Sequence, residues 1–493
     1  MAESARNGSA AWRGREGPGA AVDPPPWPAR LTGPFVAPLL GIAFGLLCGR
    51  LFGLIDRYSV NVLFWDQWDL FDPIFEHASA WELFRFRFGP HRQGIAFPLT
   101  RSLMDATGWN TRAEAFMIGA LVALAAALAL RLRRRLFGPL TAMDVAIPLL
   151  ILTPAQYGIF VHIPNASHGA APLLLLVALC CACTLPRRAP RCAALVVLNF
   201  LLVHTGFGIF AGLITPVLLV SECVDASRDG GARAALWPAS CVALSLASLG
   251  FFFVGYSFDP AVDDFAFPSP QAALYPSYVA LMLANVLGVK GTDLLPTLVG
   301  FAALAAVLFT AVVHGLGLFV RRGEARRRSA AIAALAAFGL LFCTGTAVGR
   351  ITLGLRAAQS TRYVPLIVPA FLALYLHLQT LRSLRRRLLL SCLAAVAMAA
   401  ATFPMRADEA RFMAILAYDK QRWVDAYLET GSVRLADARA RRRIYPNPPE
   451  VTHLEEKLDT LRRQRLNLFA NRPPPPEEPQ PHEAPTEPME GAD

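Results

Sequence analysis

The sequence predicts an all-α polytopic membrane protein with about 11 transmembrane helices. The 493 residues are 55% hydrophobic and only 17% charged, with a mean hydropathy of +0.42. This composition is far more apolar than that of an ordinary soluble protein. Apolar segments long enough to cross a bilayer, about 20 residues each, alternate along the chain with short runs of arginine. These two observations together define the class.

Charge and cysteine usage exclude several other classes of protein. The net charge is +11, but the arginines are concentrated in short runs between apolar segments, as the positive-inside rule requires of cytoplasmic loops. We therefore expect no nucleic-acid partner. The nine cysteines all lie in or beside apolar segments, which argues against a disulfide framework and against a zinc site built from paired cysteines.

The N-terminus is expected in the cytoplasm. Residues 1–33 are polar and rich in proline, which predicts a disordered segment. The arginines within it keep this segment inside, and the first span follows at about residues 34–55. We expect no cleavable secretion signal, because this first apolar run is long enough to span.

A long first outer loop, residues 57–112, follows the first span. It holds four of the eight tryptophans, which predicts short amphipathic helices lying on the membrane surface rather than a free soluble domain. One interpretation of Trp65 and Trp68 is that they are interfacial anchors beside acids that merely face water.

The transmembrane domain is expected to cover residues 34–405. After the first span, the predicted crossings are at about 113–130, 144–161, 235–256, 294–320, 329–348, 363–381 and 388–405, with a fourth crossing that ends before the basic run 186–191. The four basic runs determine which side of the membrane each loop faces, because a topology that places these runs outside violates the positive-inside charge bias.

Two apolar stretches do not fit single crossings. Residues 192–222 are too long for one crossing of about 20 residues, and His-Thr-Gly-Phe-Gly at 204–208 predicts a reversal between a helix that ends near Val203 and one that begins near Gly208. Residues 271–289 are apolar enough to span, but a crossing there would place the basic run 321–328 outside. We therefore expect a non-spanning helix buried against the outer face.

The C-terminal part is predicted to lie outside the membrane domain. Residues 406–470 have helical spacing, broken by Tyr-Pro-Asn-Pro-Pro at 445–449, and predict a small outer helical appendage. Residues 471–493 are rich in proline and glutamate and predict a disordered tail.

The polar residues differ between the two predicted sides of the membrane. The inner loops hold almost only arginine, whereas the outer face collects chemically varied groups. The candidate site residues on that face are Asp66, Asp69, His91, Arg92, His162, His168, Arg350, Arg362 and Tyr363. Arg350 and Arg362 are expected on the outer side, against the charge bias. Each of them singly could also snorkel to the interface or pair with an acid of the first loop.

Acids and arginines on one outer face suit transfer from a lipid phosphate. Arginine makes planar, permanently charged contacts to phosphate oxygens and stabilises charge on a departing phosphate. A carboxylate opposite can act as general base on an acceptor hydroxyl or amine.

These features resemble the GT-C superfamily of polytopic glycosyltransferases that use polyprenyl-phosphate sugars. The resemblance rests on an inside N-terminus, one span, and a long outer loop that opens with acids. The Gly-Arg…Gly…Ala…Ser-Thr-Arg-Tyr pattern at 349–363 is similar to that of bacterial membrane proteins grouped with the superfamily. The resemblance implies an inverting transferase in the bacterial inner membrane with its C-terminus in the periplasm.

The same resemblance implies residue roles and substrates. Asp66 matches the catalytic base, with Asp69 as its substitute. Arg350, Arg362 and Tyr363 would bind the donor phosphate, and His91, Arg92, His162 and His168 would position substrate. The donor would be a polyprenyl-phosphate-linked sugar within the membrane lipid, and the acceptor a cell-envelope glycan, lipid or protein.

Other interpretations stay open at this stage. Asp66 and Asp69 could hold a divalent cation, Mg²⁺ or Mn²⁺, together with a phosphate, and His91, His162 and His168 could form a metal site. A lipid-linked glycan flippase or another transporter is the alternative function; it predicts charges at mid-depth along the spans. A scaffold without chemistry predicts Asp66 and Arg362 far apart.

Overall fold

The computed structural model describes residues 35–258 and 265–470, and these residues are overwhelmingly helical. The predictions for 1–33 and 471–493 fall outside the described residues. Within the described ranges, the only strands are β1 (Arg87–Phe88) and β2 (His91–Arg92), which pair antiparallel in one short hairpin.

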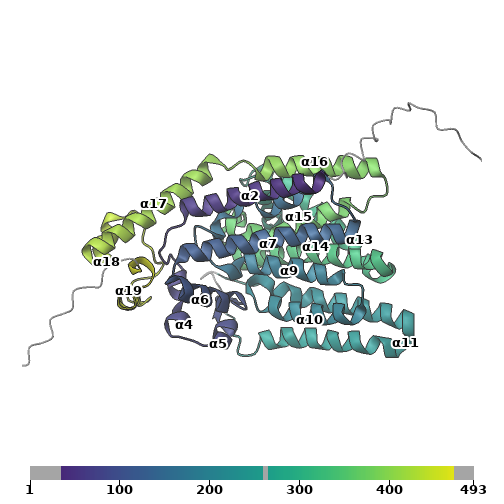
Figure 1. Cartoon of the computed structure of the whole chain (residues 1–493), viewed down its shortest axis with the longest axis horizontal. Helices are drawn as coiled ribbons and strands as arrows, with labels where there is room; N and C mark the ends of the chain where they lie inside the picture. Colours follow the sequence, from purple (N-terminus) through teal and green to yellow (C-terminus); the bar gives the residue numbers. More distant parts are fainter. Residues whose placement is uncertain (1–34, 259–264, 471–493) are drawn as a thin grey trace, which may run out of the picture.

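Seven helical segments are long and apolar enough to cross a membrane, and the number rises to eight if α16 (Leu384–Thr402) and α17 (Ala407–Thr430), bent by 42° at their junction, form one span. The seven are α2 (Val36–Tyr58), α7 (Thr111–Phe137), Ala142–Ile159 with α8 (Ala146–Ile151), Gly206–Phe252 with α11 (Ala211–Phe252), α13 (Leu294–Val320), α14 with its extension (Gly323–Leu353) and Thr361–Leu378 with α15 (Val364–Leu378). The chain is thus a membrane-embedded, all-α protein. Figure 1 shows these helices packed side by side.

The helix break predicted within 192–222 is present. Helix α10 (Arg188–Val203) ends at Val203, and a short 3-10 turn (Gly206–Phe210) leads into α11. Helix α11 itself doubles back at Gly230–Gly231, where the backbone leaves helical angles. Its two halves run antiparallel, because a Cβ on Gly212 would lie 2.9 Å from Leu249 Cδ1. The segment Ala211–Phe252 is therefore a helical hairpin and not one straight helix.

The stretch predicted as a non-spanning helix is short and buried. Helix α12 (Tyr275–Val286) has 12 residues, so it is about 18 Å long at 1.5 Å per residue, well below the ~30 Å of a hydrocarbon core. All its residues from Tyr278 to Val286 are buried. Its length and burial therefore fit the expected non-spanning helix.

The basic runs meet at one end of the helix bundle, the arginine-rich end, where acids that the sequence analysis did not consider pair with them. Glu222 of α11 accepts from Arg191 Nε and Nη2, both at 2.8 Å, and its Oε1 lies 2.9 Å from Arg326 Nη2. These three side chains are at most 5% exposed. They join α10, α11 and α14 (Gly323–Arg350), and removing one partner would leave an uncompensated buried charge.

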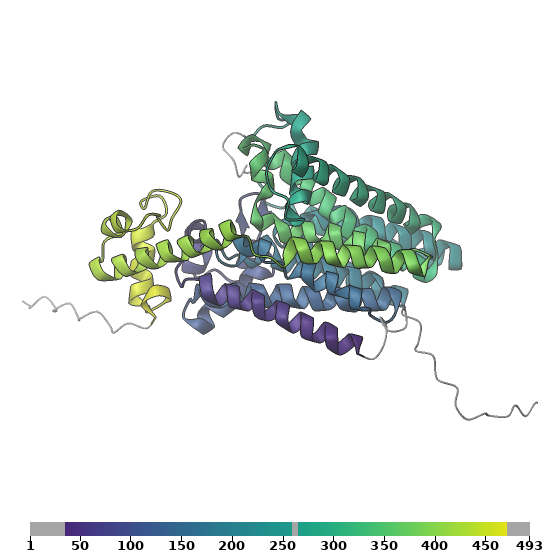
Figure 2. The same ribbon diagram turned by 90° about the horizontal axis from the view of Figure 1, so that it is seen from above.

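The opposite end, which we call the loop end, carries a second hydrophobic core. Residues 59–110 form α3 (Gln67–Leu70), α4 (Asp72–Phe75), α5 (Ala80–Arg85) and α6 (Ala96–Thr107). The C-terminal segment forms α17, α18 (Val433–Arg439) and α19 (Leu454–Arg463). Side chains from both segments pack into one cluster, with Trp68 and Trp423 fully buried. Both views show the two segments together at this end (Figures 1 and 2).

This shared core corrects one interpretation of the tryptophans. Trp68 is 0% exposed, whereas Trp65 is 40% exposed. Trp68 therefore belongs to the core and is not an interfacial anchor. The first loop and the appendage are one folded unit, because each covers apolar side chains of the other.

Candidate functional site

A polar chamber of about 400 Å³ lies at the loop end. Seven of the nine candidate site residues line it, namely Asp66, Asp69, His91, His168, Arg350, Arg362 and Tyr363. They come from α3 and the turn before it, the β1–β2 hairpin, the loop before α9 (Ala170–Cys183), the end of α14 and the turn before α15. The fold therefore brings acids and arginines together that are nearly 300 residues apart in the chain.

Asp66 is positioned by Gln67, which is completely buried. Gln67 Oε1 accepts from the backbone N–H of Phe64 at 3.0 Å. Its Nε2 donates to the carbonyl of Pro164 at 3.0 Å and to Glu114 Oε2 at 3.2 Å. One amide thus fixes the turn that presents Asp66 against both α7 and the loop that carries His168.

Replacing Gln67 with leucine is expected to destabilise the protein by about 1–3 kcal/mol, because Glu114 and the Pro164 carbonyl lose their donor. The measurement is the thermal unfolding midpoint of the purified protein in detergent. Gln421→Leu is the matched control, since Gln421 is exposed and its side chain donates to Asp425, four residues further along α17. Equal midpoints for the two variants would contradict the role given to Gln67.

The charged groups of the chamber are not paired with one another by direct contact. Within the described residues, Asp66, Arg350 and Arg362 form no ion pair and no side-chain hydrogen bond. Burial raises the pKa of Asp66, and the nearby charges of Arg362 and Arg350 act against this rise. The chamber therefore holds a carboxylate and two guanidinium groups whose hydrogen-bonding capacity is unused.

Asp69 is less free than Asp66. Asn447 Nδ2 donates to Asp69 Oδ2 at 3.2 Å. Burial raises the pKa of Asp69, while the charge of Lys457 lowers it. Asp66 is accordingly the carboxylate with the more open coordination.

The histidines of the chamber are uncharged at neutral pH. Burial, with the charges of Arg350 and Arg362, lowers the pKa of His91 to about 4. The pKa of His168 is lowered well below its usual value, mainly by burial. The two rings meet edge to face with centroids 5.0 Å apart. Among the described residues, both ring nitrogens of His91 and Nε2 of His168 lack a hydrogen-bond partner, so a bound molecule can use them.

Close backbone contacts fix the loops that hold these histidines. Gly206 has φ +55°, and a Cβ there would overlap the carbonyl oxygen of Ser167. Gln93, next to the β2 strand, accepts from Asn165 Nδ2 at 3.3 Å and from the Ser167 hydroxyl. Only glycine allows this approach of residue 206 to 167, so His168 is held in place beside the hairpin.

Two candidate residues stand outside the chamber. His162 lines a smaller neighbouring cavity of about 170 Å³, and burial together with the charge of Lys420 lowers its pKa to about 4. Arg92 lines neither cavity. Its guanidinium group donates to the carbonyls of Phe252, Val254 and Arg85 at 2.6–3.0 Å. The position of Arg92 therefore corrects its assignment to substrate: it ties the hairpin to the end of α11.

The C-terminal appendage contributes lining that the sequence analysis missed. Pro446 and Asn447 complete the chamber wall, together with Phe88, Gly89 and Pro90 of the hairpin and Phe207. The only available signal was the Tyr-Pro-Asn-Pro-Pro segment, which reads equally well as a simple helix break.

Lysines attach the appendage to the loops around the chamber. Lys457 Nζ donates to the Trp68 carbonyl at 2.8 Å and lies 2.5 Å from Asp72. Lys420 Nζ donates to the carbonyls of Val161 and His162 at 3.0 and 2.9 Å. Each of the two lysines thus holds one loop of the chamber.

An apolar cleft of about 220 Å³ adjoins the chamber. The two cavities share five lining residues, and Arg350 stands at their junction. Aromatic rings dominate the wall of the cleft, namely Phe207, Phe210, Phe258, Phe265 and Tyr363. A polar compartment therefore continues directly into an apolar one.

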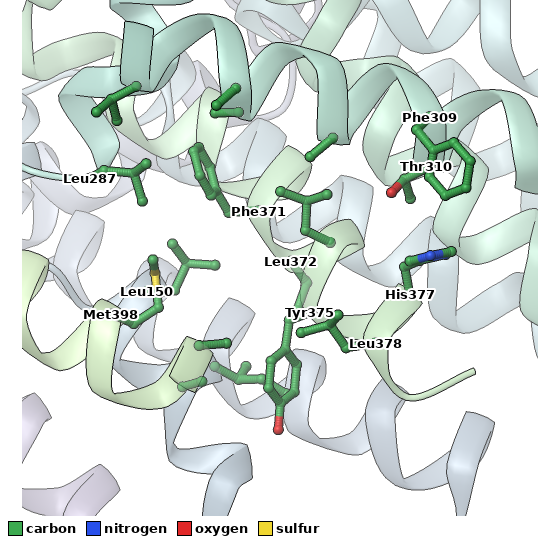
Figure 3. Close-up of a pocket in the computed structure, with 18 residues that line it drawn as sticks. Leu150, Leu287, Phe309, Thr310, Phe371, Leu372, Tyr375, His377, Leu378 and Met398 are labelled. Atoms are coloured by element: carbon green, nitrogen blue, oxygen red, sulfur yellow. The ribbon is translucent and has the colours of Figure 1, made fainter. Parts of the chain in front are cut away.

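A larger apolar cavity of about 520 Å³ lies between α8, α13, α15 and α16 and shares no lining residue with the chamber. Figure 3 shows mostly apolar side chains around it, with Thr310 and His377 together on one side and the Tyr375 hydroxyl as the other labelled polar group. Its size alone does not make it the site, because its lining offers no carboxylate or guanidinium group.

The residues present offer at most part of a metal site. Among the described residues, no three His, Cys, Asp or Glu side chains are grouped as metal ligands would be. A divalent cation on Asp66 and Asp69 would need its other oxygen ligands from water or a substrate phosphate. The expectation of Mg²⁺ or Mn²⁺ there stays a prediction.

No family model, no curated protein and no solved structure matches this chain.

Proposed function

We propose that this protein is a GT-C-type glycosyltransferase that transfers a sugar from a polyprenyl-phosphate donor to a cell-envelope acceptor, at the outer face of the bacterial inner membrane. One observation carries the proposal: Asp66, Arg350 and Arg362 line a single polar chamber that continues into an aromatic cleft. A substrate with a charged phosphate and a long apolar chain needs this combination.

The donor would lie across the junction of the two cavities. Arg350 lines both of them, so it can hold the phosphate while the polyprenyl chain enters the cleft. Arg362 adds a second permanent positive charge in the chamber. The neutral rings of His91 and His168 leave donor and acceptor nitrogens for phosphate oxygens or sugar hydroxyls.

Asp66 would act as the base. As the acceptor oxygen forms its bond to the anomeric carbon, Asp66 takes the proton of the acceptor hydroxyl. The bond from that carbon to the phosphate oxygen breaks, and its electron pair stays on the phosphate. Arg350 and Arg362 stabilise the charge that develops there. The pKa of Asp66 is raised by burial, which strengthens a carboxylate as a base.

The topology belongs to the same proposal. Eleven crossings follow if α9, α10, both halves of α11 and α16 also traverse the bilayer beside the other spans. The positive-inside rule then assigns the arginine-rich end to the cytoplasm and the loop end to the periplasm. The N-terminus would be cytoplasmic and the appendage periplasmic.

The distribution of charge favours an enzyme over the alternative transporter. The unpaired charges gather in one chamber at the loop end, whereas Glu222 with Arg191 and Arg326 at the opposite end form ion pairs. A transport path would instead require usable charged groups at mid-depth between the two ends.

Binding of undecaprenyl phosphate to the purified protein tests the proposal. We expect binding that undecaprenol, which lacks the phosphate, does not match. Arg350→Gln should weaken it by about 10- to 100-fold, since a charge-assisted hydrogen bond contributes about 1.5–3 kcal/mol. Native mass spectrometry or a titration in detergent gives the dissociation constants.

Arg356→Gln is the matched control for this experiment. Arg356 lies in the same 349–363 segment, is exposed, and lines neither the chamber nor the cleft. The proposal is wrong if undecaprenol binds as tightly as its phosphate, or if Arg350→Gln and Arg356→Gln bind the phosphate equally well.

A further inference from the structure

Asp66 lies at the boundary of two cavities. Asp66, His168 and Arg362 line both the main chamber and the smaller cavity of about 170 Å³ behind it, which we call the side chamber. A group bound in one cavity therefore meets a group bound in the other across Asp66.

An exposed aromatic ring stands at the side chamber. Trp65 lines it and is 40% exposed, whereas Trp68, three residues further along the chain, is buried in the neighbouring core. Trp65 also has φ +56°, which is rare for any residue with a side chain. The appendage holds this conformation, because the Trp65 N–H donates to the Ile444 carbonyl at 2.6 Å. Strain that keeps a large ring at a cavity, rather than in a core, points to a binding role.

Another part of the wall is polar. Ser360, Thr361 and Arg362 form it. A Cβ on Gly158 would lie 2.5 Å from Thr361 Oγ1 and 3.3 Å from the backbone nitrogen of Arg362. The two backbones therefore approach as closely as glycine permits. His162 adds a neutral imidazole to the same cavity, since its pKa is about 4. The side chamber thus faces an indole ring with hydroxyl, imidazole and carboxyl groups.

We propose that the side chamber receives the acceptor and that the acceptor group is a sugar ring bearing the attacking hydroxyl. This inference rests on the proposed transferase function. A pyranose has an apolar C–H face that suits the indole of Trp65 and a rim of hydroxyls that suits Ser360 and His162. A cavity of about 170 Å³, equal to roughly five or six water volumes of ~30 Å³, accepts one ring and excludes a folded polypeptide segment.

The arrangement also fits the chemistry of the transfer. With the donor phosphate at the arginines of the main chamber, an acceptor in the side chamber approaches the anomeric carbon from the opposite side. Asp66 lines both cavities, so it can take the proton of the acceptor hydroxyl as the new bond forms. Attack opposite the departing phosphate inverts the configuration at that carbon.

A panel of methyl hexopyranosides serves as the acceptor probe. Saturation-transfer NMR on the purified protein should detect binding of at least one member to the wild type. The signal should be lost in Trp65→Ala and largely kept in Trp65→Phe, which retains an aromatic face. In transfer assays, Trp65→Ala should raise the acceptor KM by about 10-fold or more, with the dissociation constant of undecaprenyl phosphate unchanged.

Trp81→Ala is the matched control. Trp81 lies in the same outer loop and is 51% exposed, but it lines neither chamber. If no methyl hexopyranoside binds, or if Trp65→Ala and Trp81→Ala behave alike, the assignment of the side chamber is overturned while donor binding stands. If undecaprenyl phosphate itself fails to bind the wild type, the proposed transferase function is overturned and this assignment with it.

Discussion

Asp66→Asn is expected to lower the rate of sugar transfer by about 10²- to 10⁴-fold, the usual contribution of a general base. Asparagine has nearly the same shape as aspartate but cannot accept the proton of the acceptor hydroxyl. Binding of undecaprenyl phosphate should change little, because in the proposed complex Arg350 and Arg362 hold the phosphate. The measurement is turnover with a panel of undecaprenyl-phosphate-linked sugars, alongside the binding titration.

Two further variants make the Asp66 result specific. Asp105→Asn alters a surface carboxylate of the same outer loop, 49% exposed and, among the residues that the structure describes, paired only with Arg101, and should keep full transfer. Asp69→Asn should have a smaller effect than Asp66→Asn, since Asn447 already occupies one oxygen of Asp69. Full transfer by a folded Asp66→Asn, with loss in Asp69→Asn, would move the role of base to Asp69.

Arg362→Ala is expected to reduce transfer by about 10²- to 10³-fold, the range seen when one stabilising contact to a developing charge is removed. Its second effect is on the pH profile. The Arg362 charge lowers the pKa of Asp66 more than the Arg350 charge does. Without Arg362 the pKa of Asp66 rises, so a larger fraction of the base is protonated at a given pH. The acid limb of the rate profile should therefore move to higher pH.

The pH profile also provides the control for Arg362→Ala and the result that would contradict its proposed role. Arg356→Ala removes an arginine from the same segment but lines no chamber, and should leave the acid limb in place. The Arg362 charge also lowers the pKa of His91, so the same comparison in a His91→Gln background assigns the shift to Asp66. An acid limb that stays put, or moves to lower pH, in Arg362→Ala would exclude the proposed pairing of Arg362 with Asp66.

Local signals were sufficient for the helix breaks. The Thr-Gly-Phe-Gly run predicted the end of α10 at Val203, and the charge bias predicted that 271–289 does not cross. The double glycine at 230–231 was an equally local signal for the turn within α11, where a turn between two spans was already expected. About 11 crossings remain a prediction, since seven or eight helical segments meet the length and hydropathy criteria.

Long-range contacts were beyond the reach of the sequence. Asn447 bonds Asp69 across 378 positions of the chain, and no periodicity within either segment announces such a contact. Arg92 illustrates the converse case, a predicted site residue that the fold uses elsewhere. Its neighbours in sequence made it a site candidate, yet the carbonyls at the end of α11 take up its guanidinium group.

The lysines were a signal that could have been read. The chain has 47 basic Lys and Arg residues, of which only Lys290, Lys420 and Lys457 are lysines. Each lysine makes a contact between the C-terminal segment and another part of the protein. Lys290 contacts Glu409 of the C-terminal segment, and Lys420 and Lys457 of that segment hold the loops of the chamber. A residue type that is rare in this arginine-rich chain thus marked contacts of the appendage.

The sequence by itself determined that this is an all-α membrane protein with chemically varied residues at one end. Hydropathy and charge bias are sums over neighbouring residues, so they can be read without knowing the fold. Only the tertiary structure decided which polar groups share a cavity, that Trp68 is core while Trp65 stays exposed, and that the appendage completes the chamber. Those outcomes depend on how helices distant in the chain pack, and packing is a property of pairs of surfaces rather than of any one segment.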